Sequence, residues 1–255
     1  MRLHTVFIDK YPEISIINLG DVHFGNPNCD RKGFKNIVHI IKKTPNMYWV
    51  STGDLLEVAL KGSLGDVYKS QPLQEELQSI VDILSPIRKK CLGIVGSNHH
   101  DRLERETGLN LDHVICAWLG IPYLGYFGFL RIVVQNVGFY LCLHHGFGFG
   151  RSPGAKVNNM AYIGQVAKGF DVYLTGHTHS FSILTDTDWI LDRKHYKMVK
   201  RDVYYVCTGH FLNYKDSYAE RKALKPKPKW CARLDLISKG NPSCKKIKVG
   251  HLEVI

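Results

Sequence analysis

The sequence lacks several features that would place it in other classes of protein. It has no apolar run long enough to span a membrane and no apolar leader segment, so we expect no membrane contact. It also has no internal repeat and no low-complexity linker, which favours one α/β domain over residues 1–255. Its seven cysteines form no CxxC pair, and several lie in apolar runs; we therefore expect reduced, buried thiols in a cytoplasmic protein.

Acidic residues are scarce relative to basic ones. The chain has 23 Asp and Glu against 34 Lys and Arg, a formal net charge of +11. This balance favours anionic partners such as nucleic acid or nucleotides, although it also suits a basic protein with no such partner. From about residue 181 the sequence becomes β-rich, with runs at 181–184, 203–208, 230–237 and 245–249. Basic residues concentrate in this part, at Arg193–Arg201 and in the loop Lys222–Lys229.

Candidate metal ligands follow the first predicted buried strand. The β-branched run Glu13–Leu19 predicts that strand, and Asp21 and His23 come directly after Gly20. Two residues apart on an extended backbone, the two side chains project to the same side. A carboxylate with an imidazole suits Mn, Fe or Zn. The alternative is that Asp21 caps a helix and His23 lies on the surface.

Two further strands end in the same kind of loop. The strand predicted at Tyr48–Thr52 leads to Asp54, whose two oxygens can each bind one metal ion; alternatively Asp54 caps a helix that begins at residue 55. The strand at Cys91–Val95 leads to Asn98 and His99. Asn98 offers a neutral carbonyl oxygen, and His99 can donate a proton to a leaving oxygen.

The last two loops contain only histidines as candidate ligands. Phe139–Leu143 is followed by two histidines, of which we favour His145 because the adjacent glycine permits a turn. The short strand at 172–174 leads to His177 and His179, which can aim at two points and therefore suit a metal pair. Such loops form the active-site edge of an open α/β sheet.

Helical periodicity separates these strands, and basic residues follow some of the candidate ligands. Apolar positions recur with helical period at Arg31–Lys43, Leu73–Leu84 and Asn159–Lys168. Three side chains are candidate phosphate contacts: Arg102, Arg151 and Lys156. The last two lie in the glycine-rich segment Phe147–Lys156, whose backbone amides could cradle phosphate and in which Phe147 or Phe149 could stack on a base. The alternatives are solvated charges and a flexible loop.

The ordered array of motifs resembles the calcineurin-like metallophosphoesterase superfamily from Ile14 to about Thr208. The matching motifs are Asp21-Val22-His23, Gly53-Asp54, Asn98-His99, His145-Gly146 and Gly176-His177-Thr178-His179. The stretches His144–Lys156 and Asp216–Glu220 resemble the phage and prophage branch in particular. The resemblance implies a four-layer α/β/β/α sandwich with two mixed β-sheets.

The resemblance also implies a ligand set for two divalent ions, with Mn first and Fe or Zn as alternatives. One ion would take Asp21, His23, Asp54 and His179, and the other Asp54, Asn98, His145 and His177. His99 would act as general acid. Two positions depart from the family pattern: Ser97 replaces a glycine, and His100 stands where an acidic residue is common. Asp101, one position later, is the candidate to orient His99.

The predicted function is hydrolysis of phosphodiester bonds by a metal-dependent enzyme. Nucleic acid, above all DNA, is the leading substrate, and the enzyme would be a nuclease or an end-processing enzyme in a bacterial or phage-infected cell. The alternatives are a phosphoesterase for small or cyclic nucleotides and a non-catalytic accessory subunit that binds nucleic acid. The complete ligand set argues against the accessory subunit. Oligomeric state does not follow from the sequence.

Overall fold

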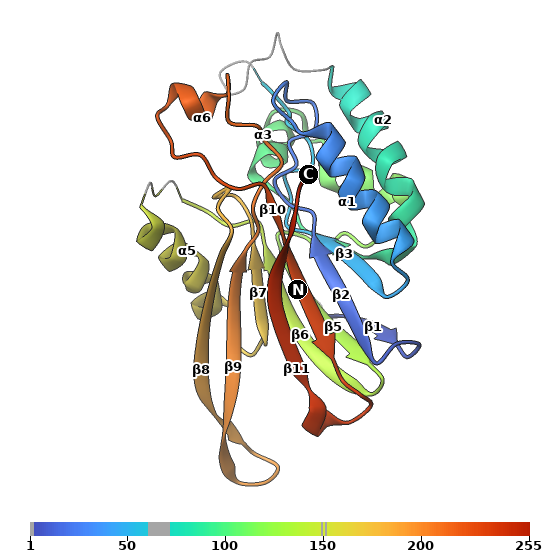
Figure 1. The fold of residues 1–255 in the computed structure, drawn as a ribbon, viewed down its shortest axis with the longest axis vertical. Helices are drawn as coiled ribbons and strands as arrows, with labels where there is room; N and C mark the ends of the chain where they lie inside the picture. The colour runs from blue at the N-terminus through green and yellow to red at the C-terminus, as the bar shows by residue number, and fades with distance from the viewer. Residues whose placement is uncertain (1–2, 61–71, 149, 151) are drawn as a thin grey trace.

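Two β-sheets stack face to face in the computed structural model of the chain, which describes residues 3–60, 72–148, 150 and 152–255 (Figure 1). The six-stranded sheet runs in the order β1 (Leu3–Ile8), β5 (Phe127–Val134), β6 (Val137–His144), β7 (Val172–Thr175), β9 (Lys197–Cys207) and β8 (Ser182–Asp192). The five-stranded sheet runs in the order β11 (Lys246–Glu253), β10 (Trp230–Ile237), β2 (Glu13–Asn18), β3 (Met47–Ser51) and β4 (Cys91–Ile94). Both sheets combine parallel and antiparallel pairs.

Helices cover the outer face of each sheet. The helices are α1 (Arg31–Lys43), α2 (Leu73–Leu84), α3 (Asn98–Thr107), α4 (Leu111–Leu119), α5 (Pro153–Val166) and α6 (Tyr218–Arg221), with short 3₁₀ turns η1 (Ser85–Lys90) and η2 (Pro242–Cys244). In Figure 1, α1 and α2 lie beside the five-stranded sheet and α5 beside the six-stranded one. No helix in the described part of the chain is both long and apolar enough to cross a membrane.

Three apolar clusters hold the layers together. On the α1 side, Phe34 and Ile41 pack with Trp49 of β3. Between the sheets, Ile16 of β2 shares a cluster with Phe139 of β6. Beneath α5, a smaller cluster joins the helix to β6, β7 and β9. This arrangement confirms the predicted four-layer sandwich of two mixed sheets, because each sheet buries one face against the other and one against helices.

Local signals predicted some elements better than others. α1 and α2 have the predicted bounds, and Asp30 caps α1 by accepting a hydrogen bond from the Gly33 amide at 2.9 Å. α5 begins earlier than predicted because Ser152 caps it and Pro153 begins it, and it ends at Val166 rather than Lys168. β1 and α4 were not predicted. The β8–β9 hairpin is also longer than the predicted runs, with 11 residues in each strand.

The outer half of the β8–β9 hairpin extends past the five-stranded sheet (Figure 1). Trp189, Leu191 and Met198 are exposed there. Because neither face of this half is fully buried, its sequence lacks the strict apolar and polar alternation that marks a half-buried strand. The extended hairpin was therefore not predictable from periodicity.

Replacing the buried Phe139 with alanine should destabilise the protein by about 3–5 kcal/mol, because it removes a large side chain from the core between the sheets. Trp189→Ala, which truncates an exposed ring on the hairpin, should change stability by no more than about 0.5 kcal/mol. Urea unfolding followed by circular dichroism measures both. An equal loss in the two variants would contradict the assignment of the core.

Candidate metal centre

The predicted ligand loops meet at one end of the sandwich. β2, β3 and β4 are parallel neighbours in one sheet, and β6 and β7 are parallel neighbours in the other. Their carboxyl ends therefore lie at the same edge. Backbone hydrogen bonds tie the loops together: the His23 amide donates to the Asp54 carbonyl at 3.0 Å, and the Gly176 amide to the His145 carbonyl at 2.8 Å. The His177 amide also donates to the Asp21 carboxylate at 2.9 Å, which joins the two sheets.

Five candidate ligands have a left-handed backbone. Their φ angles are 51° for Asp21, 50° for His23, 53° for Asp54, 69° for His177 and 49° for His179. Non-glycine residues in this region cost about 1–3 kcal/mol each and concentrate at functional sites. Residues 55–60 form no helix, and neither do residues 19–29. The alternative interpretations of Asp21 and Asp54 as helix caps are therefore wrong, and His23 is buried rather than on the surface.

One group of possible ligands comprises Asp21, His23 and His179. One atom from each lies within 4.8 Å of the others. The Nε2 atoms of His23 and His179 are 2.9 Å apart, and His179 Nε2 is 3.5 Å from Asp21 Oδ1. Two imidazole nitrogens and a carboxylate oxygen facing one point are a typical donor set for Mn, Fe or Zn.

Asp54 lies between this group and a second one, which comprises Asn98, His145 and His177. Its Oδ2 is 3.8 Å from His23 Nε2 on one side and 3.2 Å from His145 Nε2 on the other. His177 Nδ1 is 3.3 Å from His145 Nε2. Because Asp54 contacts ligands of both groups, its position fits a carboxylate shared by two cations.

Asn98 contributes a buried acceptor to the site. Its Oδ1 has no hydrogen-bond partner among the residues that the structure describes. A buried acceptor without a partner costs about 1–3 kcal/mol. Asn98 begins α3, and the amide of the next residue, His99, donates to Asp54 Oδ1 at 3.4 Å. The unpaired oxygen beside Asp54 fits the role of a neutral metal ligand.

Surrounding groups fix the tautomers of the rings. His145 Nδ1 is 2.7 Å from the Thr52 carbonyl, so it carries the proton and leaves Nε2 directed at Asp54. His23 Nδ1 is 3.1 Å from the Glu57 carboxylate. Metal-binding histidines usually have a carbonyl or carboxylate beside their second ring nitrogen. The structure adds Glu57 to the site; in the sequence only its place as an acid within the apolar run Leu55–Val58 hinted at burial.

Charge balance at the centre depends on imidazoles beside buried carboxylates. Burial raises the pKa of Asp21 to about 7, and the Asp54 charge adds to this effect. Burial alone would lower the pKa of His145, but the neighbouring Asp54 carboxylate raises it to about 9. Burial lowers the pKa of His177 to about 4, which leaves that ring in the neutral, metal-binding form. Divalent cations compensate the negative charge of the carboxylates in the same way as protonated imidazole rings. They displace the ring protons when they bind. The residues therefore fit a metal centre.

His99 lies beside the ligands with its ring held in place. Its Nδ1 donates to the Glu57 carbonyl at 2.9 Å, and its Nε2 is 3.8 Å from Asp54 Oδ2. The pKa of His99 is lowered to about 4, mainly by burial; the Asp54 carboxylate opposes this shift, and the charges of His23 and Arg102 add to it. The carboxylate next to the His99 ring is therefore that of Asp54, and not one from its own helix α3.

Asp101 does not orient His99 as we had predicted. The two residues are two apart on α3, and such side chains do not face each other on a helix. The Asp101 carboxylate instead accepts from the Tyr126 hydroxyl at 3.1 Å and pairs with Arg105 at 2.5 Å. His100 is buried and pairs with Asp112 of α4 at 2.8 Å, so it anchors α3 rather than serving the site. The orienting contact to His99 belongs to the Glu57 carbonyl.

The predicted phosphate contacts are only partly placed. Lys156 of α5 donates from Nζ to the Thr178 carbonyl at 2.9 Å, between the two histidines of that loop. Arg102 is half-buried on α3 and close enough to influence the His99 pKa. Arg151 and Phe149 lie outside the described residues. His210, which follows β9, stacks on His179 with ring centroids 5.3 Å apart.

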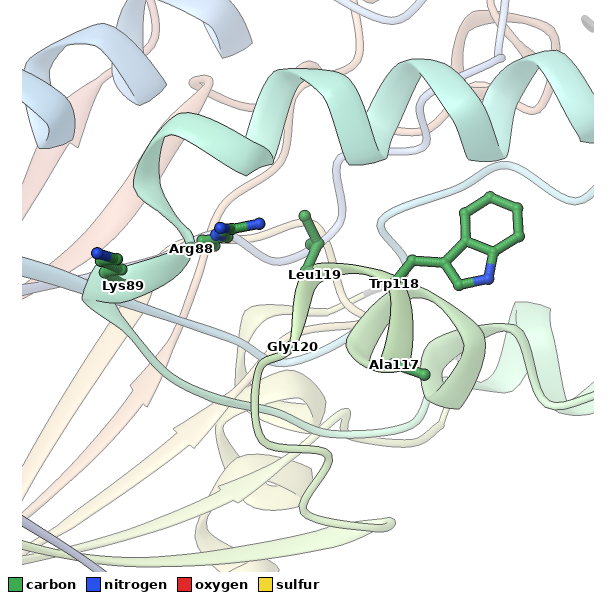
Figure 2. A pocket seen from close by; sticks show the side chains of 6 residues that line it. All are labelled: Arg88, Lys89, Ala117, Trp118, Leu119 and Gly120. Atoms are coloured by element: carbon green, nitrogen blue, oxygen red, sulfur yellow. The ribbon is translucent and has the colours of Figure 1, made fainter.

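A surface hollow of about 400 Å³ lies away from the centre, between η1 and α4 (Figure 2). It is lined by Arg88, Lys89, Ala117, Trp118, Leu119 and Gly120. This lining includes none of the candidate ligands. The hollow is therefore not part of the metal centre.

Comparisons with known proteins give distant similarities. No family model matches the chain, and no curated protein matches it. A predicted phosphoesterase from Streptococcus pneumoniae is 14% identical, with a TM-score of 0.38 over 93% of this chain and 98% of that one. Vps29 from Chaetomium thermophilum is 11% identical, with a TM-score of 0.43 over 94% and 95%. A metallophosphoesterase from Sphaerobacter thermophilus is 11% identical, with a TM-score of 0.43 over 95% and 90%.

These identities and TM-scores are too low to assign the chain to a family. Two of the three structures are titled as phosphoesterases, and none of the three is described as a phage protein. The phage and prophage placement stays a prediction.

Glu57→Gln should weaken metal binding about 10- to 100-fold, because it removes the charged partner that orients His23. Titration of metal-free protein with Mn²⁺ measures the affinity. Glu104→Gln is the matched control, since Glu104 contacts Asn110 and Tyr126 away from the centre and should bind Mn²⁺ like wild type. Unchanged affinity in Glu57→Gln would show that Glu57 does not support the ligand.

Proposed function

We propose that the protein is a metal-dependent phosphodiesterase that cleaves nucleic acid, with DNA as the leading substrate. The observation that carries this proposal is the position of Asp54. Its carboxylate lies within 3.8 Å of imidazole nitrogens of both ligand groups. A shared carboxylate between two groups of histidines supports a pair of cations rather than one.

The residues present suit two divalent cations, with Mn as the first metal to test. Asp21, His23 and His179 would hold one cation, Asn98, His145 and His177 the other, and Asp54 both. Such a pair, when bound, supplies Lewis acidity to a water molecule and to phosphate oxygens. The chain's own residues must then hold the phosphate, orient it and provide a proton for the leaving oxygen.

His99 is the proposed proton donor. The Glu57 carbonyl holds its Nδ1, so its Nε2 is directed at the Asp54 side of the centre. A bound phosphodiester is negatively charged and favours the protonated ring. The proton on Nε2 would pass to the leaving oxygen. Arg102, Lys156 and Arg151 are the proposed contacts to phosphates of the substrate.

The charge of the whole chain supports nucleic acid as the substrate. A net charge of +11 attracts a polyanion over most of its length. Binding dominated by phosphate contacts is nearly independent of base sequence and weakens steeply with salt. A small-nucleotide enzyme has little use for a charge of this size and would show a weak salt dependence.

Wild-type protein loaded with Mn²⁺ should cleave end-labelled single- or double-stranded DNA, and Asp54→Asn should not. The asparagine removes the negative charge shared by both ligand groups, so metal content should fall together with turnover. Gel electrophoresis follows cleavage, and metal analysis of the purified proteins follows loading. Equal cleavage by Asp54→Asn with its metal retained would contradict the shared role.

Other outcomes of the same experiment identify the alternative functions. Hydrolysis of a generic phosphodiester without DNA cleavage would favour a small-nucleotide enzyme. DNA binding without hydrolysis of either substrate would favour an accessory subunit. Repeating the binding at rising salt distinguishes these, because only contacts to many phosphates give a steep loss.

His99→Ala should keep the bound metal but lower kcat about 10²- to 10⁴-fold, the usual effect of a lost proton donor. Asp101→Asn is the matched control on the same helix, because that carboxylate contacts Tyr126 and Arg105 and should leave kcat near wild type. Metal analysis and steady-state kinetics measure the two effects separately. Loss of metal from His99→Ala would make His99 a ligand rather than the donor.

A further inference from the structure

Two aromatic side chains meet on the surface beside the metal centre. Phe147 follows β6, and Tyr162 lies on α5; their ring centroids are 5.8 Å apart and the rings are nearly perpendicular at 81°. Phe147 is 38% exposed and Tyr162 51% exposed. A pair of large exposed rings leaves apolar surface in contact with water, which marks a candidate binding surface. We call this pair the aromatic shelf.

The shelf is held close to the candidate ligands. Phe147 is two residues beyond His145, so their Cα atoms are separated by at most about 7.6 Å. The next carbonyl, that of Gly148, is 3.1 Å from His177 Nε2. One segment thus carries both a candidate ligand and an exposed ring.

The loop that carries Phe147 is also fixed to α5. Asn159 donates from Nδ2 to the Phe147 carbonyl at 3.2 Å. Gly148 has a φ of 88°, and a Cβ there would fall 2.2 Å from Asn159 Nδ2, so only glycine permits this close approach. Asn159 and Tyr162 are three residues apart and therefore share a face of the helix. The two rings are preorganised rather than carried on independent segments.

The charge next to the shelf favours an anionic ligand. Lys156, on the same helix, reaches the Thr178 carbonyl in the histidine loop. Exposed aromatic rings stack on nucleobases with little sequence preference, because every base has a flat π-face. In a nucleotide, the base is joined to its phosphate by a single sugar. A phosphate at the metal centre therefore brings its own base into the neighbourhood of the shelf.

We infer that Phe147 and Tyr162 form a nucleobase subsite, in which the base of the nucleotide at the scissile phosphate stacks on the aromatic shelf. This inference rests on the proposed phosphodiesterase function and adds the residues that bind the nucleoside next to the cleaved bond. Stacking is sequence-tolerant, so the subsite prefers nucleosides over base-free groups without strong selection among bases.

The test compares two diesters with the same leaving group, thymidine 5′-(p-nitrophenyl) phosphate and ethyl p-nitrophenyl phosphate. The readout is the ratio of kcat/KM for the nucleoside diester to kcat/KM for the ethyl diester. Removing one stacking ring, in Tyr162→Ala or Phe147→Ala, should lower this ratio about 5- to 150-fold. Most of the change should appear as a higher KM for the nucleoside diester.

Two controls separate stacking from a general loss of structure. Tyr162→Phe keeps the ring and should keep the wild-type ratio. Trp118→Ala removes an equally exposed ring at the distant hollow of Figure 2 and should also leave the ratio unchanged. A wild-type ratio in both Tyr162→Ala and Phe147→Ala would overturn the subsite while the phosphodiesterase function stood.

If the wild-type protein hydrolyses neither diester, the proposed phosphodiesterase function is rejected, and a binding measurement tests the subsite instead. Fluorescence anisotropy with a short labelled oligothymidine then reports the shelf without turnover. Tyr162→Ala and Phe147→Ala should bind about 5- to 150-fold more weakly than wild type. Equal affinity in all three proteins would overturn the subsite.

Discussion

The charge of a carboxylate that is almost fully removed from water is the constraint around which the site is built. Asp54 is 1% exposed, and isolating such a charge in a protein interior costs several kcal/mol unless partners compensate it. Burial would raise the pKa of Asp54, but the charges of His145 and His99 lower it well below its usual value. The burial of Asp54 therefore requires the imidazoles around it, whether or not they take part in catalysis. The same side chains suit divalent cations as ligands, and a bound cation compensates the Asp54 charge with fewer groups than the imidazoles need.

The two sheets contribute unequal parts of this arrangement. The five-stranded sheet supplies the carboxylates, which follow β2 and β3, and the six-stranded sheet supplies most of the imidazoles, which follow β6 and β7. The bond from the His177 amide to the Asp21 carboxylate crosses between them. Carboxylates from one sheet and imidazoles from the other thus meet at one edge, so correct packing of the sandwich also assembles the site. The left-handed residues at this edge are tolerated because the core of the sandwich holds both sheets in place.

Much of this site could be predicted because its signals are local in the sequence. Each candidate ligand follows a buried strand and stands near a glycine, and the resemblance of the five ordered motifs to a known superfamily implied the sandwich. Glu57 was not predicted, because an acid within a short apolar run hints at burial but does not show which group it contacts. Asp101 was assigned wrongly because the assignment rested on its place one position after the acidic residue of the family pattern, whereas α3 begins at Asn98 and its turn directs that carboxylate to Tyr126.

Glu57 also shows why side-chain reasoning alone could not complete the site. Its carboxylate holds His23, and its carbonyl holds His99, so one residue orients both a candidate ligand and the candidate proton donor. The second contact comes from the backbone and exists whatever side chain stands at that position. The tautomer of His99 is consequently a property of the loop's conformation, which depends on the bridge between Phe24 and Leu56 that brings this loop against the one after β2. A shift of this one loop would therefore displace the partners of both His23 and His99 at once.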